Sequence, residues 1–250
     1  MDLGLQDKRV LVTGATRGIG LATARAFAEE SARVAVTYHS ARDAADRVVD
    51  ELGGPDRALA LPYDLADPAS ARAAVRAVEQ RWGGVDVLIA NAQTWVWTNP
   101  EETPGYHELP MEYWLDRFRE NVEGHLWAVR EALGGMRERG WGRVVLLSSV
   151  TATHGNPGSE LYSAAKAALH GFVRGLMWTR HGVLANVVAP GGTLTESLEA
   201  VDPALLARAT EETPSGRLST AAEVARLVVF LGSEANGNVN GEVVHTAGGR

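Results

Sequence analysis

The sequence predicts a single-domain α/β protein with a doubly wound, mostly parallel sheet of about seven strands and helices on both faces. Short apolar segments alternate with longer amphipathic segments along the whole chain, a pattern typical of strand–helix–strand units. A glycine-rich turn follows the first apolar segment, which is typical of a Rossmann-type fold. No linker rich in Pro, Gly or Ser and no repeat divides the 250 residues, so we expect one domain over 1–250.

The expected elements follow one another in regular alternation. The strands are apolar segments near 9–13, 33–37, 58–62, 85–90, 143–148, 183–189 and 242–246. Helices are expected between them, with two long ones around 112–138 and 160–180. Residues 191–212 are expected to form a loop followed by short helices that close over a substrate and exclude water.

The first strand, turn and helix predict a binding site for phosphate. The segment reads KRVLVTGATRGIGLATARAFAEE, with a strand from Val10 to Thr13 and a helix running to about Ser31. The turn between them contains Gly14, Gly18 and Gly20. Glycines let the backbone turn tightly and approach a pyrophosphate, and a helix N-terminus offers free N–H groups and a positive dipole end.

Tyr162, Lys166 and Ser149 together predict carbonyl–alcohol redox chemistry. Tyr162 and Lys166 are i and i+4 in an expected helix, so both project from one face. A phenol with a pKa near 10 needs a neighbouring cation to stabilise its ionised form, and Lys166 can supply it. Ser149 follows an apolar strand pattern, which places its hydroxyl at the carboxyl end of a strand, where such sheets bind ligands.

A Tyr-x-x-x-Lys spacing alone is also compatible with a core tyrosine and a solvated lysine on an amphipathic helix. The composition argues against that reading. Of the 24 basic residues only Lys8 and Lys166 are lysines. A flexible ammonium and a planar guanidinium are not interchangeable, so a lysine here indicates a specific use.

These features, taken with several others in the same order, resemble the classical short-chain dehydrogenase/reductases. The matching motifs are TGATRGIG at 13–20, Asn91-Ala92 after a strand, Asn121, Ser149, Tyr162, Lys166 and PGGTLT at 190–195. The resemblance covers essentially the whole chain. It is closest to the branch of 3-oxoacyl-(acyl-carrier-protein) reductases, in which the serine also lies 13 positions before the tyrosine.

The resemblance implies a role for each catalytic group. Tyr162 would donate a proton to the carbonyl oxygen, and Ser149 would hold and polarise that oxygen. Lys166 would bind the nicotinamide ribose and lower the phenol pKa. Asn121 would support a water-mediated proton relay, although an Asn in this helix could also be an ordinary polar residue.

The resemblance also implies the cofactor contacts, with Asp64 near the adenine, Asn91 near the adenosine ribose and Thr195 near the carboxamide. The full set is Gly14, Thr16, Arg17, Gly18, Ile19, Tyr38, His39, Ser40, Asp64, Leu65, Asn91, Ala92, Tyr162, Lys166, Pro190, Gly191, Thr193 and Thr195.

The end of the second strand predicts NADPH rather than NADH. An acidic residue there accepts a hydrogen bond from the ribose 2′-hydroxyl of NAD, whereas a cation without that acid accommodates a 2′-phosphate. Tyr38 stands where relatives that prefer NAD carry Asp, and Arg17, His39, Ser40 and Arg42 are close in sequence. Neutral His39 would hold a phosphate less firmly than a guanidinium, so Arg17 is expected to carry most of the discrimination.

The chain departs from the family pattern at a few positions. Gln93 replaces a glycine beside the cofactor, Thr193 an aliphatic residue, and Ala247 an aspartate. The segment 93–112 is longer than usual and carries several aromatic or histidine side chains, namely Trp95, Trp97, Tyr106 and His107. We expect it to overhang the pocket, with His107 and His154 at the border, although a self-packed loop or subunit contact is equally compatible.

Composition and the remaining sequence patterns limit the classes of function that the protein can have. A net charge of −7 without a basic cluster argues against nucleic-acid binding. There is no signal-peptide or membrane-span pattern, so a cytoplasmic protein is expected. The seven histidines lack metal-ligand spacing, so no metal is expected. By resemblance, the protein would form a homo-oligomer, a tetramer or dimer, through the two long helices and the last strand.

The sequence therefore predicts an NADPH-dependent ketoreductase. Its substrate would be a 3-oxoacyl thioester, linked to a carrier protein or CoA, or a polyketide-like ketone of secondary metabolism. Dehydrogenation of a secondary alcohol or sugar remains an alternative, as does a non-redox epimerase or dehydratase. A cofactor-sensing binding protein would not need the complete Ser149, Tyr162 and Lys166 set.

Overall fold

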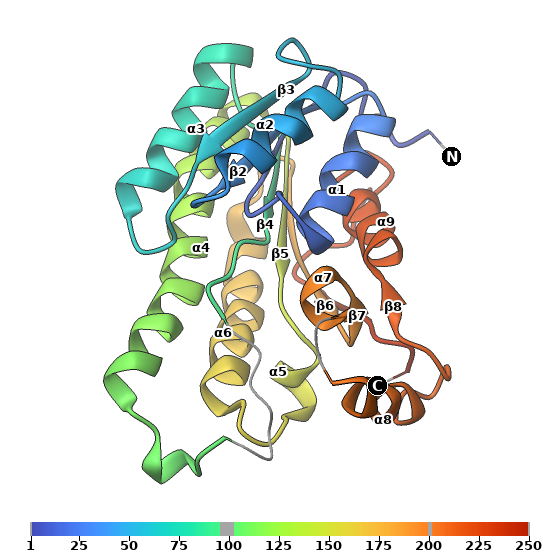
Figure 1. The fold of residues 1–250 in the computed structure, drawn as a ribbon. Coiled ribbons are helices and arrows are strands. Elements are labelled where there is room, and N and C mark those ends of the chain that lie inside the picture. The colour runs from blue at the N-terminus through green and yellow to red at the C-terminus, as the bar shows by residue number, and fades with distance from the viewer. Residues whose placement is uncertain (1, 96–102, 200–201, 250) are drawn as a thin grey trace.

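Seven parallel strands form one sheet in a computed structural model of the protein, which describes residues 2–95, 103–199 and 202–249. The strand order is β3-β2-β1-β4-β5-β6-β9, and every pairing is parallel (Figure 1). The strands are β1 (Arg9–Val12), β2 (Arg33–Tyr38), β3 (Ala58–Pro62), β4 (Val87–Ala90), β5 (Gly142–Leu147), β6 (Val183–Pro190) and β9 (Val243–Thr246). The expected doubly wound α/β class is confirmed.

Helices cover both faces of this sheet. One layer consists of α3 (Pro68–Trp82), α4 (Met111–Arg139) and α6 (Glu160–Leu176), and the other of α1 (Gly18–Glu29), α2 (Arg42–Glu51) and α9 (Ala221–Leu231). Short elements follow β5 and β6: α5 (Thr151–His154), β7 (Thr193–Leu194), α7 (Glu196–Glu199), α8 (Pro203–Glu211) and β8 (Ser219–Thr220), with β7 and β8 paired. Two 3₁₀ turns, η1 (Tyr106–Glu108) and η2 (Met177–Thr179), flank the long helices.

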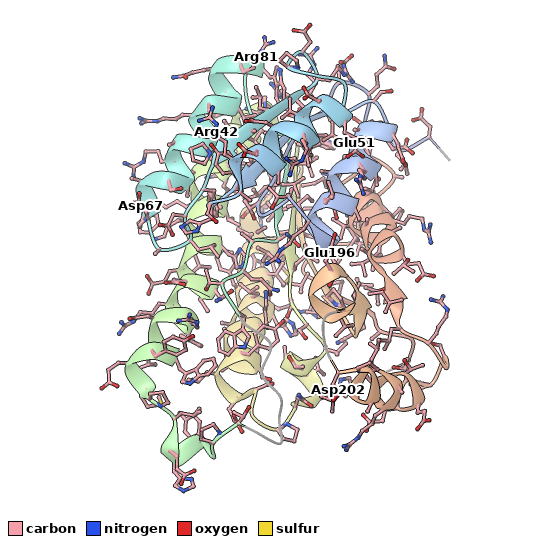
Figure 2. All side chains as sticks on the ribbon, in the orientation of Figure 1. Arg42, Glu51, Asp67, Arg81, Glu196 and Asp202 are labelled. Atoms are coloured by element: carbon pink, nitrogen blue, oxygen red, sulfur yellow. The ribbon has the colours of Figure 1, made fainter. Side chains whose placement is uncertain are left out.

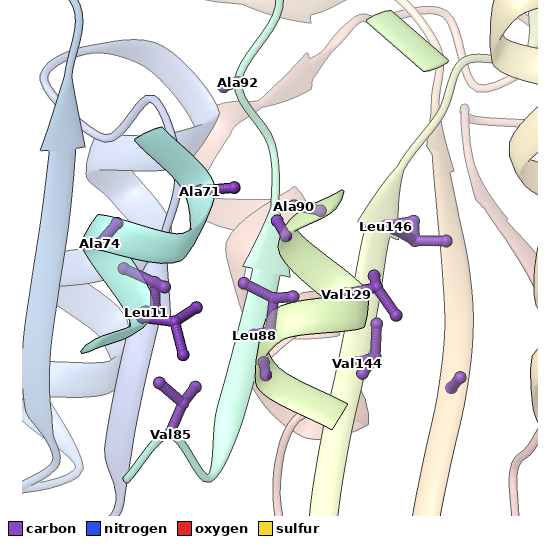
Figure 3. Close-up of a cluster of buried hydrophobic side chains, with 14 of the residues drawn as sticks. Leu11, Ala71, Ala74, Val85, Leu88, Ala90, Ala92, Val129, Val144 and Leu146 are labelled. Atoms are coloured by element: carbon purple, nitrogen blue, oxygen red, sulfur yellow. The ribbon is translucent and has the colours of Figure 1, made fainter. Parts of the chain in front are cut away.

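Alternate residues of the strands point into two separate hydrophobic cores, one on each face of the sheet. In β5, Val144 and Leu146 face the α3, α4 and α6 layer, whereas Val145 and Leu147 face the α1 and α9 layer. Figure 3 shows the first of these cores, in which small residues of α3 and Val129 of α4 meet the strand side chains. Because both faces are covered, the central strands are apolar throughout, as is typical of parallel sheets.

The expected strands are found within two residues of their observed bounds. The first ends at Val12. The hydroxyl of the following residue, Thr13, accepts hydrogen bonds from the amides of Asn91 and Ala92, which come directly after β4. The fourth begins at Val87, directly after Asp86, whose side chain forms an ion pair with Arg9 at the amino edge. The second long helix ends at Leu176 and continues as η2.

Loops at the carboxyl edge of the sheet bring distant parts of the chain together. In Figure 1 the segments after β5 and β6 lie toward the lower part of the view, with α5 beside the lower end of α6 and with α7 and α8 on the side of α1 and α9. Within the described residues, no helix is long and apolar enough to cross a membrane. The described part of the chain also contains no group of three or more acidic or histidine residues that could hold a metal ion.

Candidate active site

The glycine turn after β1 is held open by its backbone conformation and its neighbours. Gly14 has φ +64° and Gly18 has φ +57°, the left-handed region that favours glycine. A Cβ on Gly14 would lie 2.8 Å from Cα of Ala92, and one on Gly20 would collide with the carbonyl oxygen of Gly14. Only glycine fits this close packing of turn, helix and β4.

Asn91 fixes this turn from the neighbouring strand. Its Nδ2 donates to the carbonyl oxygens of Thr13 and Gly14, both at 3.0 Å. The amide of Gly14 donates to Oγ1 of Thr37 in β2 at 3.0 Å. The segments at the ends of two adjacent strands therefore shape the turn before any ligand enters.

The end of β2 carries no acidic residue. Tyr38 is the last residue of the strand and is partly buried, whereas His39 and Ser40 are exposed. Arg17, at the N-cap of α1, is also exposed. Asp64, after β3, lies 3.8 Å from the His39 imidazole, measured from Oδ2 to Nε2, so an acidic side chain from the neighbouring strand faces the end of β2.

The remaining predicted cofactor contacts also lie at the carboxyl edge. Leu65 is buried and packs against Gly124 of α4, where a Cβ would lie 2.8 Å from the Leu65 carbonyl oxygen. Thr193 is buried and donates to the carbonyl oxygen of Gly191 at 3.0 Å. The edge also brings together the other residues named from sequence, which are Thr16, Ile19, Ala92, Pro190 and Thr195.

Two residues that depart from the family pattern, Gln93 and Ala247, fit their surroundings in the structure. Gln93 is exposed, so its side chain does not fill the turn. Ala247 is buried against Gly191, where a Cβ would lie 2.9 Å from the Ala247 Cβ. The small residue at 247 therefore matches a close backbone approach.

Tyr162 stands on the first turn of α6 with Ser149 beside it, just after β5. Burial raises the pKa of the Tyr162 phenol, and its hydrogen bond with the Ser149 hydroxyl partly opposes this shift. The Ser149 hydroxyl is oriented by the backbone amide and the hydroxyl of Thr151, at 3.2 and 3.0 Å. The arrangement keeps the phenol protonated at neutral pH with a polar hydroxyl next to it.

Lys166 lies one turn further along α6 and is fully buried. Its Nζ donates to the carbonyl oxygen of Leu147 at 3.0 Å and lies 5.8 Å from the centroid of the Tyr162 ring. Burial lowers the pKa of Lys166 to about 8. The ammonium is therefore still mostly charged at neutral pH, next to the catalytic pair predicted from sequence.

The structure distinguishes the two adjacent serines. Ser148 is buried, and its Oγ donates to the Lys166 carbonyl oxygen at 3.1 Å and lies 2.8 Å from Nε2 of His170. Ser148 therefore joins β5 to α6, whereas Ser149 faces the phenol. Of these two serines, Ser149 is the one that the strand pattern and the family resemblance select, and its catalytic role remains a prediction.

Asn121 is buried in α4, and its side chain is occupied by contacts within the protein. Its Nδ2 donates to Oγ1 of Thr94 at 2.9 Å and to the carbonyl oxygen of Arg117 at 2.7 Å, and its Oδ1 accepts from the Thr94 amide at 3.3 Å. The side chain thus holds the loop after β4. Its predicted part in a proton relay remains a prediction.

Sequence reasoning missed His125, one turn after Asn121 in α4. The imidazole is fully buried, and neither ring nitrogen has a hydrogen-bond partner among the residues that the structure describes. Burial and, to a lesser extent, the Lys166 charge lower the His125 pKa to about 3. The sequence did contain a signal for this position. His125 follows Asn121 by four residues, and residues four apart lie on the same face of a helix.

The segment expected to overhang the pocket is described only in part. Trp97 lies outside the described residues. Tyr106 and His107 are exposed in η1, whereas Trp95 lies against Tyr162. His154, at the end of α5, is exposed and lies 6.3 Å from His245, ring centroid to ring centroid, rather than beside the phenol.

The edge fits a nicotinamide dinucleotide. A diphosphate needs backbone N–H groups without side chains in the way, and the left-handed glycines at the start of α1 meet that need. Residues of the glycine turn and of the end of β4 would hold the diphosphate and the adenosine half of the cofactor. Residues of α6 and of the end of β6 would hold its nicotinamide half.

Comparisons with known proteins agree with this geometry. The profile of a family described as enoyl-(acyl carrier protein) reductase matches residues 14–250. The 3-oxoacyl-(acyl-carrier-protein) reductase FabG of Vibrio cholerae is 34% identical over 249 residues, covering 99% of this chain and 98% of that protein. FabG of Escherichia coli K12 is 32% identical, with the same coverage of both chains. The 3-oxoacyl-(acyl-carrier-protein) reductase MabA of Mycobacterium avium is 34% identical over 245 residues, which cover 97% of this chain and 89% of that protein.

The Gly20→Ala variant tests the close packing of the turn. A Cβ there would lie 2.6 Å from Nδ2 of Asn91 as well as against the Gly14 carbonyl, so the turn must shift. We expect the Kd for the dinucleotide to rise at least about tenfold, measured by calorimetric titration. Gly237→Ala, where a Cβ meets no atom within 4 Å, is the control and should bind normally; equal affinity of both variants would contradict the assignment.

Proposed function

The chain belongs to the short-chain dehydrogenase/reductase family, and from that premise we propose that it is an NADPH-dependent ketoreductase. It reduces a ketone carbonyl to a secondary alcohol. The observation that carries the proposal is the buried, protonated phenol of Tyr162 with the Ser149 hydroxyl beside it. A protonated acid is the form that a reduction requires.

In the proposed mechanism the carbonyl oxygen lies between Ser149 and Tyr162. When bound, the nicotinamide supplies a hydride to the carbonyl carbon. Tyr162 transfers its phenolic proton to the oxygen, so the C=O bond becomes a C–H and an O–H bond. Ser149 donates a hydrogen bond to the oxygen as negative charge develops there.

Lys166 stabilises the phenolate that this transfer leaves behind. Its Nζ is buried within 5.8 Å of the Tyr162 ring centroid, and a charge in such a dry environment acts more strongly than in water. It would also hold the nicotinamide ribose. Reprotonation of the phenolate through water near Asn121 and Lys166 completes the cycle in this proposal.

A 3-oxoacyl thioester is the proposed substrate class. The similar FabG and MabA proteins are named for reduction of 3-oxoacyl groups on acyl carrier protein. The matching profile is described by reduction of an enoyl group instead, but a serine and a phenol that converge on one point suit a carbonyl oxygen. Segments 93–112 and 191–212 would determine which acyl group or ketone is accepted.

NADPH is the proposed cofactor because of the end of β2. Tyr38 supplies no carboxylate to accept from a 2′-hydroxyl, His39 follows it directly, and Arg17 belongs to the glycine turn after the adjacent strand β1; both Arg17 and His39 are exposed. A 2′-phosphate would be held by charge-assisted hydrogen bonds from these side chains and Ser40. NADH lacks that phosphate and should be used less well.

The setting of the enzyme is also proposed. The protein would act in the cytoplasm on a small ketone, free or linked to a carrier protein or CoA, as a tetramer or dimer. Nucleic acids, membranes and metals have no part in the proposal. Alcohol or sugar dehydrogenation, non-redox chemistry and cofactor sensing are not favoured, since similar proteins of nearly full length are reductases.

The Tyr162→Phe variant tests the reaction. A 3-oxoacyl thioester, an enoyl thioester and a bicyclic ketone would be offered with NADPH or NADH. We expect NADPH-selective reduction of a ketone, and a loss of at least about 10²-fold in kcat/KM in the variant, with NADPH binding retained. Reduction of the enoyl thioester alone, or unchanged turnover by the variant, would overturn the proposal.

The two neighbouring serines provide matched variants for the same assay. Ser149→Ala should lower kcat by about 10²-fold because it removes a donor to the developing charge. Ser148→Ala removes only the link between β5 and α6, so its effect should appear mainly as a lower Tm.

A further inference from the structure

An aromatic side chain lies directly against the catalytic tyrosine. The ring centroids of Trp95 and Tyr162 are 5.1 Å apart, with the rings tilted by 47°. Trp95 follows β4 and Tyr162 lies in the first turn of α6, so the contact joins the loop after β4 to the start of α6. Any substrate whose carbonyl reaches the Tyr162 hydroxyl must therefore pass close to the Trp95 indole.

Trp95 is held in place from two directions. On α4, the Trp114 ring lies 5.1 Å from that of Trp95, centroid to centroid. The preceding residue, Thr94, is bound through its amide and hydroxyl to the Asn121 side chain. A side chain fixed in this way loses little freedom when a ligand binds beside it.

The aromatic surface continues outward from the catalytic phenol. The Tyr113 ring meets Trp114 edge to face at 5.3 Å, and the Arg117 guanidinium lies 3.6 Å from the Tyr113 ring centroid. Tyr113 is 47% exposed, and Trp95 and Trp114 are partly exposed. These rings, which we call the aromatic wall (Trp95, Trp114 and Tyr113), form a continuous series of mutually tilted rings from Tyr162 to the exposed Tyr113.

We propose that Trp95 is a specificity-determining residue, and that the site prefers ketones with an aromatic group beside the carbonyl over straight-chain ketones. This inference rests on the proposed ketoreductase function. Aromatic rings gain free energy from offset or edge contacts beyond the area that they bury. A flexible alkyl chain gains no such contact and loses more rotational freedom on binding.

Two thioesters with equal carbon count test the preference. They are the N-acetylcysteamine thioesters of 3-oxo-3-phenylpropanoate and 3-oxononanoate, assayed with saturating NADPH. Wild type should show the higher kcat/KM for the phenyl substrate. Trp95→Leu should lower the ratio of the two kcat/KM values by about three- to tenfold, and Trp95→Phe should lower it less because a ring remains.

A remote tryptophan provides the control for this experiment. Trp178 lies in η2, 69% exposed and roughly 24 Å along α6 from Tyr162, so Trp178→Leu should leave the ratio within about twofold. No phenyl preference in wild type, or an unchanged ratio in Trp95→Leu, would overturn this inference alone. If wild type reduces neither thioester, the proposed function fails and the inference fails with it.

A second, independent contact concerns the cofactor rather than the ketone. Oε2 of Glu196, in α7, accepts from the backbone amide of Gly18 at 3.2 Å, although the two residues are 178 positions apart. Figure 2 labels Glu196 beside the start of α1. The first turn of α1 contains no acidic residue of its own, so Glu196 supplies the anion at this helix end.

We infer that Glu196 competes with the cofactor diphosphate for the start of α1 and so sets cofactor affinity. A helix N-terminus attracts anions through its free amides and its dipole. The Glu196 carboxylate already satisfies the Gly18 amide, which the proposed diphosphate site also requires. Binding must therefore move this carboxylate aside, and the two negative groups repel each other while it stays near.

NADPH titration of Glu196→Gln tests the competition without relying on activity. Quenching of the intrinsic tryptophan fluorescence measures the Kd. We expect the variant to bind NADPH about three- to tenfold more tightly at low salt, with a smaller difference at high salt because exposed charges are screened.

The matched control removes the same charge at the other end of the same helix. Glu29 is exposed at the last turn of α1, roughly 17 Å from Gly18, and Glu29→Gln should leave the Kd within about twofold. Equal or weaker NADPH binding by Glu196→Gln would overturn the competition. Absence of NADPH binding by wild type would overturn the cofactor assignment itself, and the competition with it.

Discussion

The buried ammonium of Lys166 is the constraint around which the site is organised. A charge in the protein interior is costly unless it has partners, and Lys166 has the carbonyl oxygen at the end of β5. That bond, together with the contacts of Ser148 with Lys166 and His170, ties α6 to the end of β5. The same arrangement places Tyr162 one turn earlier in α6, beside Ser149. The burial of Lys166 therefore helps to bring together the proposed proton donor, Tyr162, and the hydroxyl of Ser149 that would bind the carbonyl oxygen.

The sheet explains why so many distant residues converge on this point. Its strands are covered on both faces, so polar groups that bind ligands can gather only at the ends. The carboxyl edge brings together the glycine turn of β1, Asn91 of β4 and the catalytic groups of β5 and α6. The amino edge instead holds structural ion pairs such as that of Arg9 with Asp86.

Local patterns in the sequence were sufficient for the strands, the long helices and the motif residues, because apolar periodicity, glycines and fixed spacings act over short distances. Contacts between segments far apart were not predictable in this way. The tilted ring contact of Trp95 with Tyr162 and the hydrogen bond from Gly18 to Glu196 depend on how distant segments pack. The buried His125 was missed because its surroundings come from other elements.

The pH dependence of ketone reduction tests the account most directly. Burial keeps Tyr162 protonated, and Lys166 loses its charge above a pKa of about 8. With saturating NADPH, kcat/KM should therefore be constant between about pH 6 and 7.5 and fall above about pH 8, because the acid and the ammonium are both needed in their protonated forms. A kcat/KM that rises with pH through this range would contradict the account, since it would require a phenolate rather than a phenol.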